Sequence, residues 1–595
     1  MRNQPVVYPS LTGWGGPTYR WGLIPNCMIV QLIGLALLLA LAIGLAIPVG
    51  SYLNRVFGGE RTGLRLLAPL ERLIYRLGGT DPTAPMTWRQ YALALLTSNG
   101  VWLLYAFGLL LVQAGVPVWN QGNVPNMDWT LALNTAVSFL TSTNLQHYSG
   151  ETGATYFTQM AVLMFLQFVS AATSLAVGVA VVRSLRGETS GSVGNFYQDF
   201  VRSVTYVFLP LSAVGAAALL LTGVPMNVDP YPAVRTLEGA VQTVATGPVA
   251  AFLPIKHLGS NGGGFFGANT AHPLENPNFF AYILHLLNVL LLPMAFVVFV
   301  GYFLNRRKLA VILFTIMTGC FLALTIPTMQ QEIQGSRAIG RLGIDQRLGS
   351  LEGKEVRFGV PASAFYAGVN VVVPAGTLTS MHDSYTPLSG VFMLLGMQLD
   401  AFYGGVGSGF LYMFLYIVIA IFIGSLMIGR TPELLGKKVS IPEIQIASFV
   451  IVVLPLLYLG ATGLAVDVWN RTPDPDKTLG WLSNGGYHGF TTMLYEYVSS
   501  AAGNGSGFEG LGDNTPFWNL STAVVMGLGR YVPLIGPLAI GGRLLAKRYV
   551  PPTAGVLPTE SWTFGLLLTA VIFIIGALCF IPALALGPIA EFLTY

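Results

Sequence analysis

The sequence predicts an all-α integral membrane protein with ten transmembrane helices. Hydrophobic residues make up 53% of its 595 residues and charged residues only 9%, which is far from the composition of soluble domains. Apolar stretches of roughly 20 residues, the helical length that crosses a bilayer, recur along the whole chain. We place these spans at 25–49, 91–116, 156–182, 203–223, 279–304, 309–328, 405–428, 445–466, 518–542 and 562–588.

The first span is expected to remain in the protein as a helix, because it is too long for the core of a signal peptide. Cys27, Cys320 and Cys579 lie singly in or beside apolar stretches. This spacing indicates small buried residues and neither a disulfide framework nor a metal-binding pair.

Basic residues set the orientation of the spans, because the bilayer sorts them to the cytoplasmic side. If the first helix runs inward, both termini lie outside, and every inner segment carries arginine or lysine, within 55–89, 183–202, 306–308, 430–438 and 543–548. The outer segments hold carboxylates instead, among them Asp128, Glu275, Asp400, Glu496 and Asp513. This distribution predicts an acidic outer face that concentrates cations.

Four outer segments share one plan and predict four repeats of the form helix, pore loop, helix. In 131–151, 259–277, 365–383 and 495–511, a short helix-compatible run leads into small residues, and a carboxylate follows. Their centres lie roughly 115 to 130 residues apart, which is consistent with duplication of a whole unit. We therefore divide the chain into an extra N-terminal helix with its cytoplasmic loop (1–90), repeats at 91–190, 191–307, 308–440 and 441–548, and an extra C-terminal helix (549–595).

The segment GSNGGGFFGANTAHPLENP (259–277) indicates what these loops do. Glycine lets backbone carbonyls turn toward a common axis, and a ring of carbonyls with hydroxyls can replace the hydration shell of potassium. The pattern therefore favours a neutral potassium filter. The alternative is that the glycines form ordinary turns and close helix contacts; one plan in four loops on the same side argues against it.

Eight motifs between residues 140 and 591 resemble the potassium-binding subunit family of the Kdp potassium-transporting ATPases, and the match as a whole runs from the first helix to the C-terminus. They are LTSTNLQHYSGET (140–152), KHLGSNGGGFFGANTAHPLENP (256–277), EGKEVRFGV (352–360), MHDSYT (381–386), GGVGSG (404–409), LMIGRTPELLGKK (426–438), NGSGFEGL (504–511) and FIPALALGPIAE (580–591). The resemblance implies the fold of the potassium-transporter superfamily, with four repeats and one extra helix at each end.

The same resemblance implies partners and a location. A P-type ATPase catalytic subunit, a single-span accessory subunit and a very small helical peptide are the expected companions, in the cytoplasmic (inner) membrane of a bacterium. Potassium is expected as the substrate ion, with no organic cofactor and no nucleic acid. The ion is expected to leave sideways into the ATPase subunit.

Carried over residue by residue, the resemblance implies a potassium filter and a gate. The filter comprises Thr141, Ser142, Thr143, Gln146, Ser260, Asn261, Gly262, Pro374, Ala375, Gly376, Asn504, Gly505 and Ser506. The third segment departs from the family, in which a Ser-Cys pair is common at Pro374-Ala375, and the fourth is shorter than the family's Asn-rich version. Arg430 matches a position suited to an electrostatic barrier, although an arginine at a helix end also snorkels to the interface.

Two functions from different classes fit these observations. The chain is either the non-catalytic, ion-selecting subunit of an ATP-driven import complex, or a stand-alone potassium channel or cation symporter. The sequence contains no Walker A motif, and Asp476-Lys477-Thr478 is interrupted by Leu479 on the outer side. Pumping therefore requires a partner that hydrolyses ATP.

An intramembrane enzyme is disfavoured, because no nucleophile–base pair or metal cluster is visible in the sequence. A zinc site at His272 and Glu275 is also disfavoured, because no third ligand is evident and Pro273 disfavours a helix that would align the two side chains. We expect this pair to brace the filter.

Overall fold

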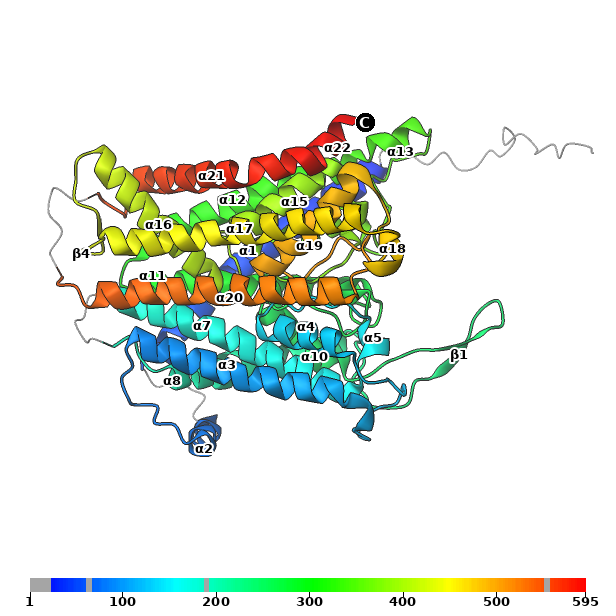
Figure 1. The fold of residues 1–595 in the computed structure, drawn as a ribbon, viewed down its shortest axis with the longest axis horizontal. Helices are drawn as coiled ribbons and strands as arrows, with labels where there is room; N and C mark the ends of the chain where they lie inside the picture. Colours follow the sequence, from blue (N-terminus) through cyan, green and yellow to red (C-terminus); the bar gives the residue numbers. More distant parts are fainter. Residues whose placement is uncertain (1–22, 60–66, 187–191, 550–556, 595) are drawn as a thin grey trace, which may run out of the picture.

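Ten long apolar helices form the bundle in the computed structural model, which describes residues 23–59, 67–186, 192–549 and 557–594 (Figure 1). Within these residues, the helices long and apolar enough to cross a membrane are Ile29–Phe57, Trp88–Leu111, Tyr156–Leu185, Phe196–Leu221, Phe279–Phe303, Arg307–Arg341, Ser408–Met427, Ile441–Arg471, Pro516–Leu545 and Trp562–Thr594. The predicted fold class and each of the ten predicted spans are confirmed.

Seven of these spans are built on one continuous helix each: α1 (Leu23–Phe57), α3 (Trp88–Leu111), α11 (Phe279–Phe303), α12 (Arg307–Gln334), α16 (Ser408–Met427), α17 (Ile441–Arg471) and α20 (Pro516–Leu545). The other three contain a π-helical stretch between α-helical parts. They are α6 (Tyr156–Thr158), η3 (Gln159–Met164) and α7 (Phe165–Leu185); α8 (Phe196–Arg202), η4 (Ser203–Phe208) and α9 (Leu209–Leu221); and α21 (Trp562–Leu584), η7 (Ala585–Ile589) and α22 (Ala590–Thr594).

Burial separates central from peripheral helices. In the most apolar stretch of the span that ends with α7, 89% of the residues are buried, against 28% for the spans of α1 and α3. Because lipid covers exposed apolar side chains as readily as protein does, the less buried helices form the periphery of the bundle. The helix α7 therefore lies at its centre.

Four shorter helices lie between paired spans: α4 (Trp129–Leu140), α10 (Val249–Leu258), α14 (Gly359–Val372) and α19 (Gly486–Ala502). At 10 to 17 residues, each is shorter than the roughly 20 residues that cross a bilayer. Each one ends where a small-residue segment begins, as the four-repeat pattern predicts. We call these four elements the pore helices.

The third repeat contains one helix that the hydropathy pattern did not reveal. A buried half-helix, α15 (Pro387–Leu399), precedes α16, and residues 400–407 separate the two. Asp400 and Gly407 both have positive φ, of 43° and 80°, so the helix cannot continue through this loop. At 13 residues, α15 is too short to register as a span by itself.

Shorter elements lie in the segments between these helices: α2 (Ala68–Gly78), η2 (Gln113–Gly115), α5 (Gly150–Gly153), η5 (Asn269–Ala271), α13 (Arg337–Arg341), η6 (His382–Ser384), α18 (Pro475–Thr478), and strands β1 (Ala233–Arg235), β2 (Val241–Thr243), β3 (Glu433–Leu434) and β4 (Lys437–Lys438). The hairpins are antiparallel, with Ala233 opposite Thr243 and Glu433 opposite Lys438. Figure 1 places β1, α18 and the last helix at one end and β4 at the other, with α2 beside the bundle below α8. The segments expected outside and inside thus separate along the bundle axis.

Site-directed labelling tests the orientation of these two ends. Arg186 and Asp229 are both exposed, at the basic and the acidic end respectively. In a background without Cys27, Cys320 and Cys579, Asp229→Cys is expected to react with an impermeant thiol reagent applied outside, and Arg186→Cys to react only after the membrane is permeabilised. The reverse labelling pattern would place the pore helices on the cytoplasmic side and contradict the predicted orientation. Among the positions considered from sequence, Lys437 is buried and Arg61 lies outside the described residues.

Candidate functional site

The four small-residue segments that follow the pore helices close into one ring. A Cβ atom added to Gly262 would overlap the carbonyl oxygen of Ala375, and one added to Gly376 would overlap that of Asn504. A Cβ on Gly505 would overlap the carbonyl oxygen of Thr143. The first and second segments meet through Ser142, whose Oγ donates to Asn261 Oδ1 at 2.6 Å. The ring thus runs from the first segment through the second, third and fourth and back to the first.

The C-terminal ends of the pore helices converge on this ring. Because α4, α10, α14 and α19 end at Leu140, Leu258, Val372 and Ala502, their last carbonyl groups lie next to the four segments. A helix carries roughly half a negative charge at its C-terminus. The ring is therefore electrostatically suited to a cation without containing a carboxylate.

The backbone of the ring is strained in a way that is typical of functional sites. Ser142, Asn144 and Ser260 have φ of 66°, 56° and 50°. Residues other than glycine rarely adopt this backbone region. Gly262, at φ 78°, has the same left-handed conformation and no space for a side chain. These left-handed residues let the backbones of neighbouring segments come into close contact.

Several predicted filter side chains hold the ring together. The Oε1 of Gln146 accepts from the amide of Gly264 at 2.6 Å, and its Nε2 donates to the Gly264 carbonyl at 3.2 Å. Asn504 Nδ2 donates to the carbonyl of Asn370 at 2.9 Å, and its Oδ1 accepts from the amide of Ser506 at 2.8 Å. Thr141 Oγ1 lies 2.9 Å from Thr143 Oγ1. Pro374 and Ala375 are buried in the third segment.

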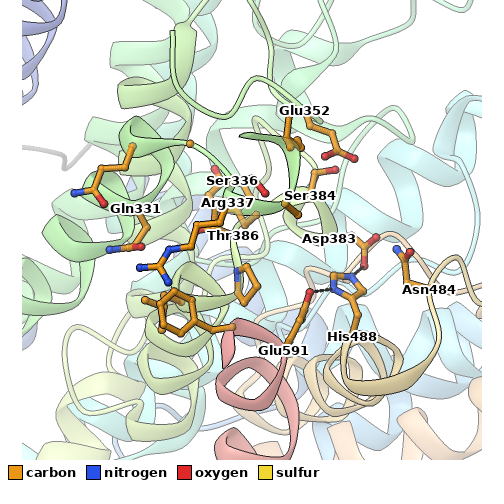
Figure 2. A pocket seen from close by; sticks show the side chains of 18 of the residues that line it. Gln331, Ser336, Arg337, Glu352, Asp383, Ser384, Thr386, Asn484, His488 and Glu591 are labelled. Carbon is orange, nitrogen blue, oxygen red and sulfur yellow. Dashed lines mark hydrogen bonds and ion pairs between the residues drawn. The ribbon is translucent and has the colours of Figure 1, made fainter. Parts of the chain in front are cut away.

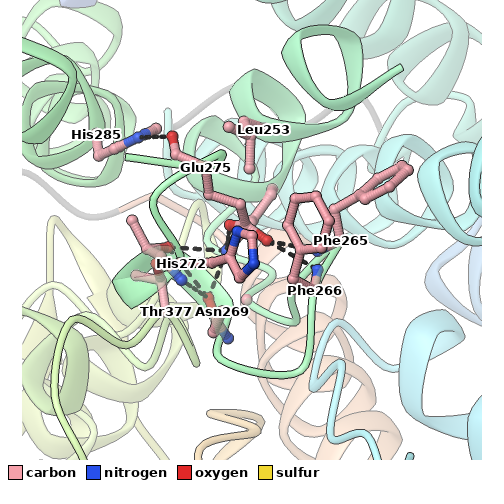
Figure 3. Close-up of polar contacts among 12 residues, drawn as sticks. Leu253, Phe265, Phe266, Asn269, His272, Glu275, His285 and Thr377 are labelled. Atoms are coloured by element: carbon pink, nitrogen blue, oxygen red, sulfur yellow. Dashed lines mark hydrogen bonds and ion pairs between the residues drawn. The ribbon is translucent and has the colours of Figure 1, made fainter. Parts of the chain in front are cut away.

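A buried ion pair braces the second segment from behind (Figure 3). Lys256 Nζ donates to Glu275 Oε2 at 2.8 Å, and both side chains are fully buried. The other oxygen, Oε1, accepts from the amides of Phe265 and Phe266 at 2.7 and 3.1 Å. Lys256 also donates to Asn269, whose Nδ2 reaches the Gly376 carbonyl at 3.1 Å. The expected bracing role of Glu275 therefore has a geometric basis, with Lys256 as its partner.

His272, the other residue expected in this brace, stacks on the ring of Phe266 with centroids 3.9 Å apart. Its Nδ1 accepts from the amide of Leu274 at 3.1 Å. Burial lowers the pKa of His272, which favours the neutral imidazole that this acceptor role requires.

A small cavity inside the ring is bounded by loop 400–407 and by Arg530. Its lining includes Ser142, Ser260, Pro374 and Gly503 from the four segments. Arg530, in the middle of α20, donates to Ser174 Oγ and lies 3.4 Å from the Ser170 carbonyl oxygen. Asp400 and Arg530 together line the neighbouring cavity. A positive charge thus lies directly beside the inner side of the ring.

The residue expected to form a gate lies elsewhere. Arg430 is exposed and follows the end of α16 at the basic end of the bundle. A second arginine, Arg530, lines the cavity at the inner side of the ring. An arginine in the middle of a transmembrane helix is by itself a functional signal, and this signal in α20 could have identified Arg530 from sequence.

The acidic outer face is less exposed than the sequence predicted. Asp400 is buried in the loop inside the ring, and Glu275 is neutralised by Lys256. Glu496 is also buried, whereas Asp128 is a helix cap whose carboxylate accepts from the amide of Thr130. Because these carboxylates are buried, neutralised or used as a helix cap, they contribute less to a general surface field than a sequence count implies.

A polar pocket of about 550 Å³ lies apart from the ring, between α12, α13, α15, α19 and α22 (Figure 2). His488 bridges Asp383 and Glu591 there, at 2.9 Å from each carboxylate. Burial opposes a charge on His488, but these two hydrogen bonds outweigh it and raise its pKa to about 10. The bridge ties the start of a pore helix to the C-terminal helix at neutral pH.

Four pore helices and their loop segments, enclosed by ten apolar helices, define a multi-pass helical membrane protein. The family model of the potassium-transporting ATPase A subunit matches residues 36–593, and the chain belongs to this family. It is accordingly a membrane-spanning subunit that takes part in potassium transport.

Three relatives named potassium-transporting ATPase potassium-binding subunit match over nearly the whole chain. The protein of Flavobacterium johnsoniae is 48% identical over 95% of this chain and 100% of its own length. That of Bacteroides fragilis is 44% identical over 95% and 100%, and that of Geobacillus kaustophilus 44% over 94% and 98%. The solved potassium transporter TrkH from Vibrio parahaemolyticus aligns with a TM-score of 0.45 at 14% identity, covering 72% of this chain and 83% of that one.

Proposed function

We propose that this chain selects extracellular potassium in the ring and passes it through the membrane domain of an ATP-driven, high-affinity import complex. The observation that carries the proposal is the closed ring of segments 141–143, 260–262, 374–376 and 504–506 at the ends of four pore helices. An uncharged ring of closely packed backbone suits a weakly hydrated monovalent cation. Gln146 is proposed to position the second segment through Gly264.

The energy for transport is proposed to come from a partner. A P-type ATPase subunit would hydrolyse ATP, while this chain, together with a single-span accessory subunit and a small helical peptide, remains non-catalytic. The basic end, with α2 and the hairpin of β3 and β4, is the proposed docking side. We place the complex in a bacterial inner membrane with both termini of this chain outside, and we retain the division into an N-terminal helix, four repeats and a C-terminal helix.

The alternative, a stand-alone channel or symporter, needs an open route straight through the chain. Loop 400–407 and Arg530 lie in that route, directly inside the ring. A fixed positive charge beside a narrow cavity opposes free passage of cations. This arrangement favours a subunit that hands its ion sideways to a partner.

Comparison of the chain alone with its co-purified complex tests the proposal. In sealed vesicles, ATP is expected to drive rubidium uptake only when the partners are present, and the chain alone should hydrolyse no ATP. Rapid ATP-independent uptake by the purified chain would support the channel. ATP hydrolysis by a preparation free of other subunits would overturn the division of labour.

Removing the charge of Arg530 is expected to open a leak. Arg530→Gln keeps most of the side chain length but deletes the positive charge beside the ring. If that charge contributes a barrier of about 1.4 kcal/mol or more, ATP-independent rubidium flux through the complex rises at least about tenfold. Isotope uptake into sealed vesicles without ATP measures this flux.

Arg430→Gln is the matched comparison, because it removes the same charge from an exposed position at the end of the bundle. Its flux should stay close to that of the parent protein. A leak in Arg430→Gln and none in Arg530→Gln would mean that Arg430, the residue suggested by the sequence, forms the gate.

A further inference from the structure

A cluster of one imidazole and two carboxylates lies next to the ring and shares no residue with it. The ligand atoms of His147, Glu496 and Asp513 all lie within 4.8 Å of one another. His147 follows the first segment, Glu496 belongs to the fourth pore helix α19, and Asp513 follows the fourth segment. The cluster therefore spans the joint between the first and fourth repeats, where Gly505 packs on Thr143.

The orientation of His147 leaves one ring nitrogen facing the carboxylates. Its Nδ1 lies 2.6 Å from Asn519 Oδ1, and the Nδ2 of Asn519 donates to Thr130 and Asn514, at 3.2 Å each. Because the amide oxygen faces the imidazole, Nδ1 carries a hydrogen. A histidine held in this way by a second group presents Nε2 as a metal ligand.

The distances around Nε2 match a metal site better than a hydrogen-bond network. Nε2 lies 3.4 Å from Glu496 Oε1 and 3.7 Å from Asp513 Oδ2, longer than the 2.7–2.9 Å or so of a charge-assisted hydrogen bond. Ligands about 2.0–2.1 Å from a tetrahedral zinc ion lie roughly 3.3 Å apart. Small movements of the two carboxylates would therefore complete three ligands, with water as a fourth.

The charges of the cluster also call for a cation. Among the described residues, Glu496 has His147 as its only polar partner, although its side chain is only 2% exposed. No lysine or arginine in the described part of the chain pairs with Glu496 or Asp513. Burying two neighbouring carboxylates is costly unless a cation or a proton lies between them.

A proton on Nε2 is the competing occupant. Burial opposes that proton, whereas Asp513 and Glu496 favour it and raise the pKa of His147 to about 9. A proton and a metal ion compete for the same lone pair of Nε2. A divalent cation would neutralise both carboxylates at neutral pH and use the lone pair of Nε2.

We propose that His147, Glu496 and Asp513 bind a divalent transition-metal ion of the zinc class, which links the first and fourth repeats beside the potassium-binding ring. Nitrogen and carboxylate ligands together favour zinc over calcium or magnesium, which prefer oxygen alone. The side chain of Asp513 is 26% exposed, so the ion can enter from the outer side.

Metal content tests this proposal directly. The complex, purified with its partners and stripped with a chelator, is dialysed against zinc chloride at increasing concentrations, and bound zinc is measured by elemental analysis. The parent complex is expected to bind one zinc ion more per copy of this chain than Glu496→Gln/Asp513→Asn. Bound cobalt should give a visible spectrum of nitrogen and oxygen ligation that His147→Asn loses.

Asp467→Asn is the matched control, because Asp467 is an exposed outer carboxylate paired with Arg471 and should leave zinc binding unchanged. Asp513→Asn alone, at the partly exposed ligand, carries the test if the double variant fails to fold, with zinc affinity at least about tenfold weaker. Equal zinc content in the parent and the folded ligand variants would overturn the proposal.

Discussion

Gly262→Asp is expected to weaken potassium affinity at least about tenfold and to abolish discrimination against sodium and ammonium. Gly262 has φ of 78°, and any Cβ there would overlap the carbonyl oxygen of Ala375 and approach Gly376 Cα to 2.6 Å. The ring must therefore open between its second and third segments, at a cost above the roughly 1.4 kcal/mol of a tenfold change in affinity. The added carboxylate also places a fixed charge in a neutral ring.

Cation-stimulated ATPase activity of the co-purified complex measures this loss for each ion. A glycine in an ordinary span is the natural control, provided that there is space for an added Cβ. Gly301 in α11 does not meet this condition, because its Cβ would approach Ala310 Cβ to 2.5 Å. Gly319 in α12 would have nothing within 4 Å of an added Cβ, so Gly319→Ala should leave affinity and selectivity unchanged. Parent-like behaviour of Gly262→Asp would mean that this segment is only a packed turn.

Glu275→Gln is expected to destabilise the protein by about 3–5 kcal/mol, the cost of leaving one partner of a buried ion pair alone. The glutamine can still accept from the amides of Phe265 and Phe266, but Lys256 loses its counter-charge. Since both amides follow directly after Gly264, the second segment should loosen. Thermal unfolding of the complex and its potassium-stimulated ATPase activity should therefore fall together.

Two further variants isolate the charge as the cause. Lys256→Met combined with Glu275→Gln removes both charges, and part of the lost stability should return. Glu238→Gln alters an exposed carboxylate in the turn between β1 and β2 and should have no effect. If Glu275→Gln matched the parent in both measurements, the ion pair would have no role in holding the ring.

The spans and the ring segments were predictable because their signals are local. A helix that crosses lipid must bury its own backbone hydrogen bonds and present apolar side chains, so composition alone marks α1 or α11. Glycine and small polar residues after a short helix mark a re-entrant loop in the same way. The contacts of Gly262, Gly376 and Gly505 bring together residues of all four segments that the sequence marks as loops.

The partners of the charged residues were not predictable in this way. Arg530 lies beside the ring, and Lys256 pairs with Glu275 across 19 residues of chain. His147 meets Glu496 across 349 residues. The sequence placed Asp400 among the outer carboxylates, whereas the break after α15 brings it to the cavity that it lines together with Arg530, next to the ring cavity.

The sequence by itself determined that this chain spans the membrane ten times and carries four related loops, because the bilayer imposes length, polarity and charge rules on each segment separately. Only the tertiary structure decided which carboxylates are buried, what Arg530 contacts and that His147, Glu496 and Asp513 form a cluster. Those outcomes depend on packing between repeats that are distant in sequence, where the cost of a buried charge is set by whichever groups the fold brings within a few ångströms.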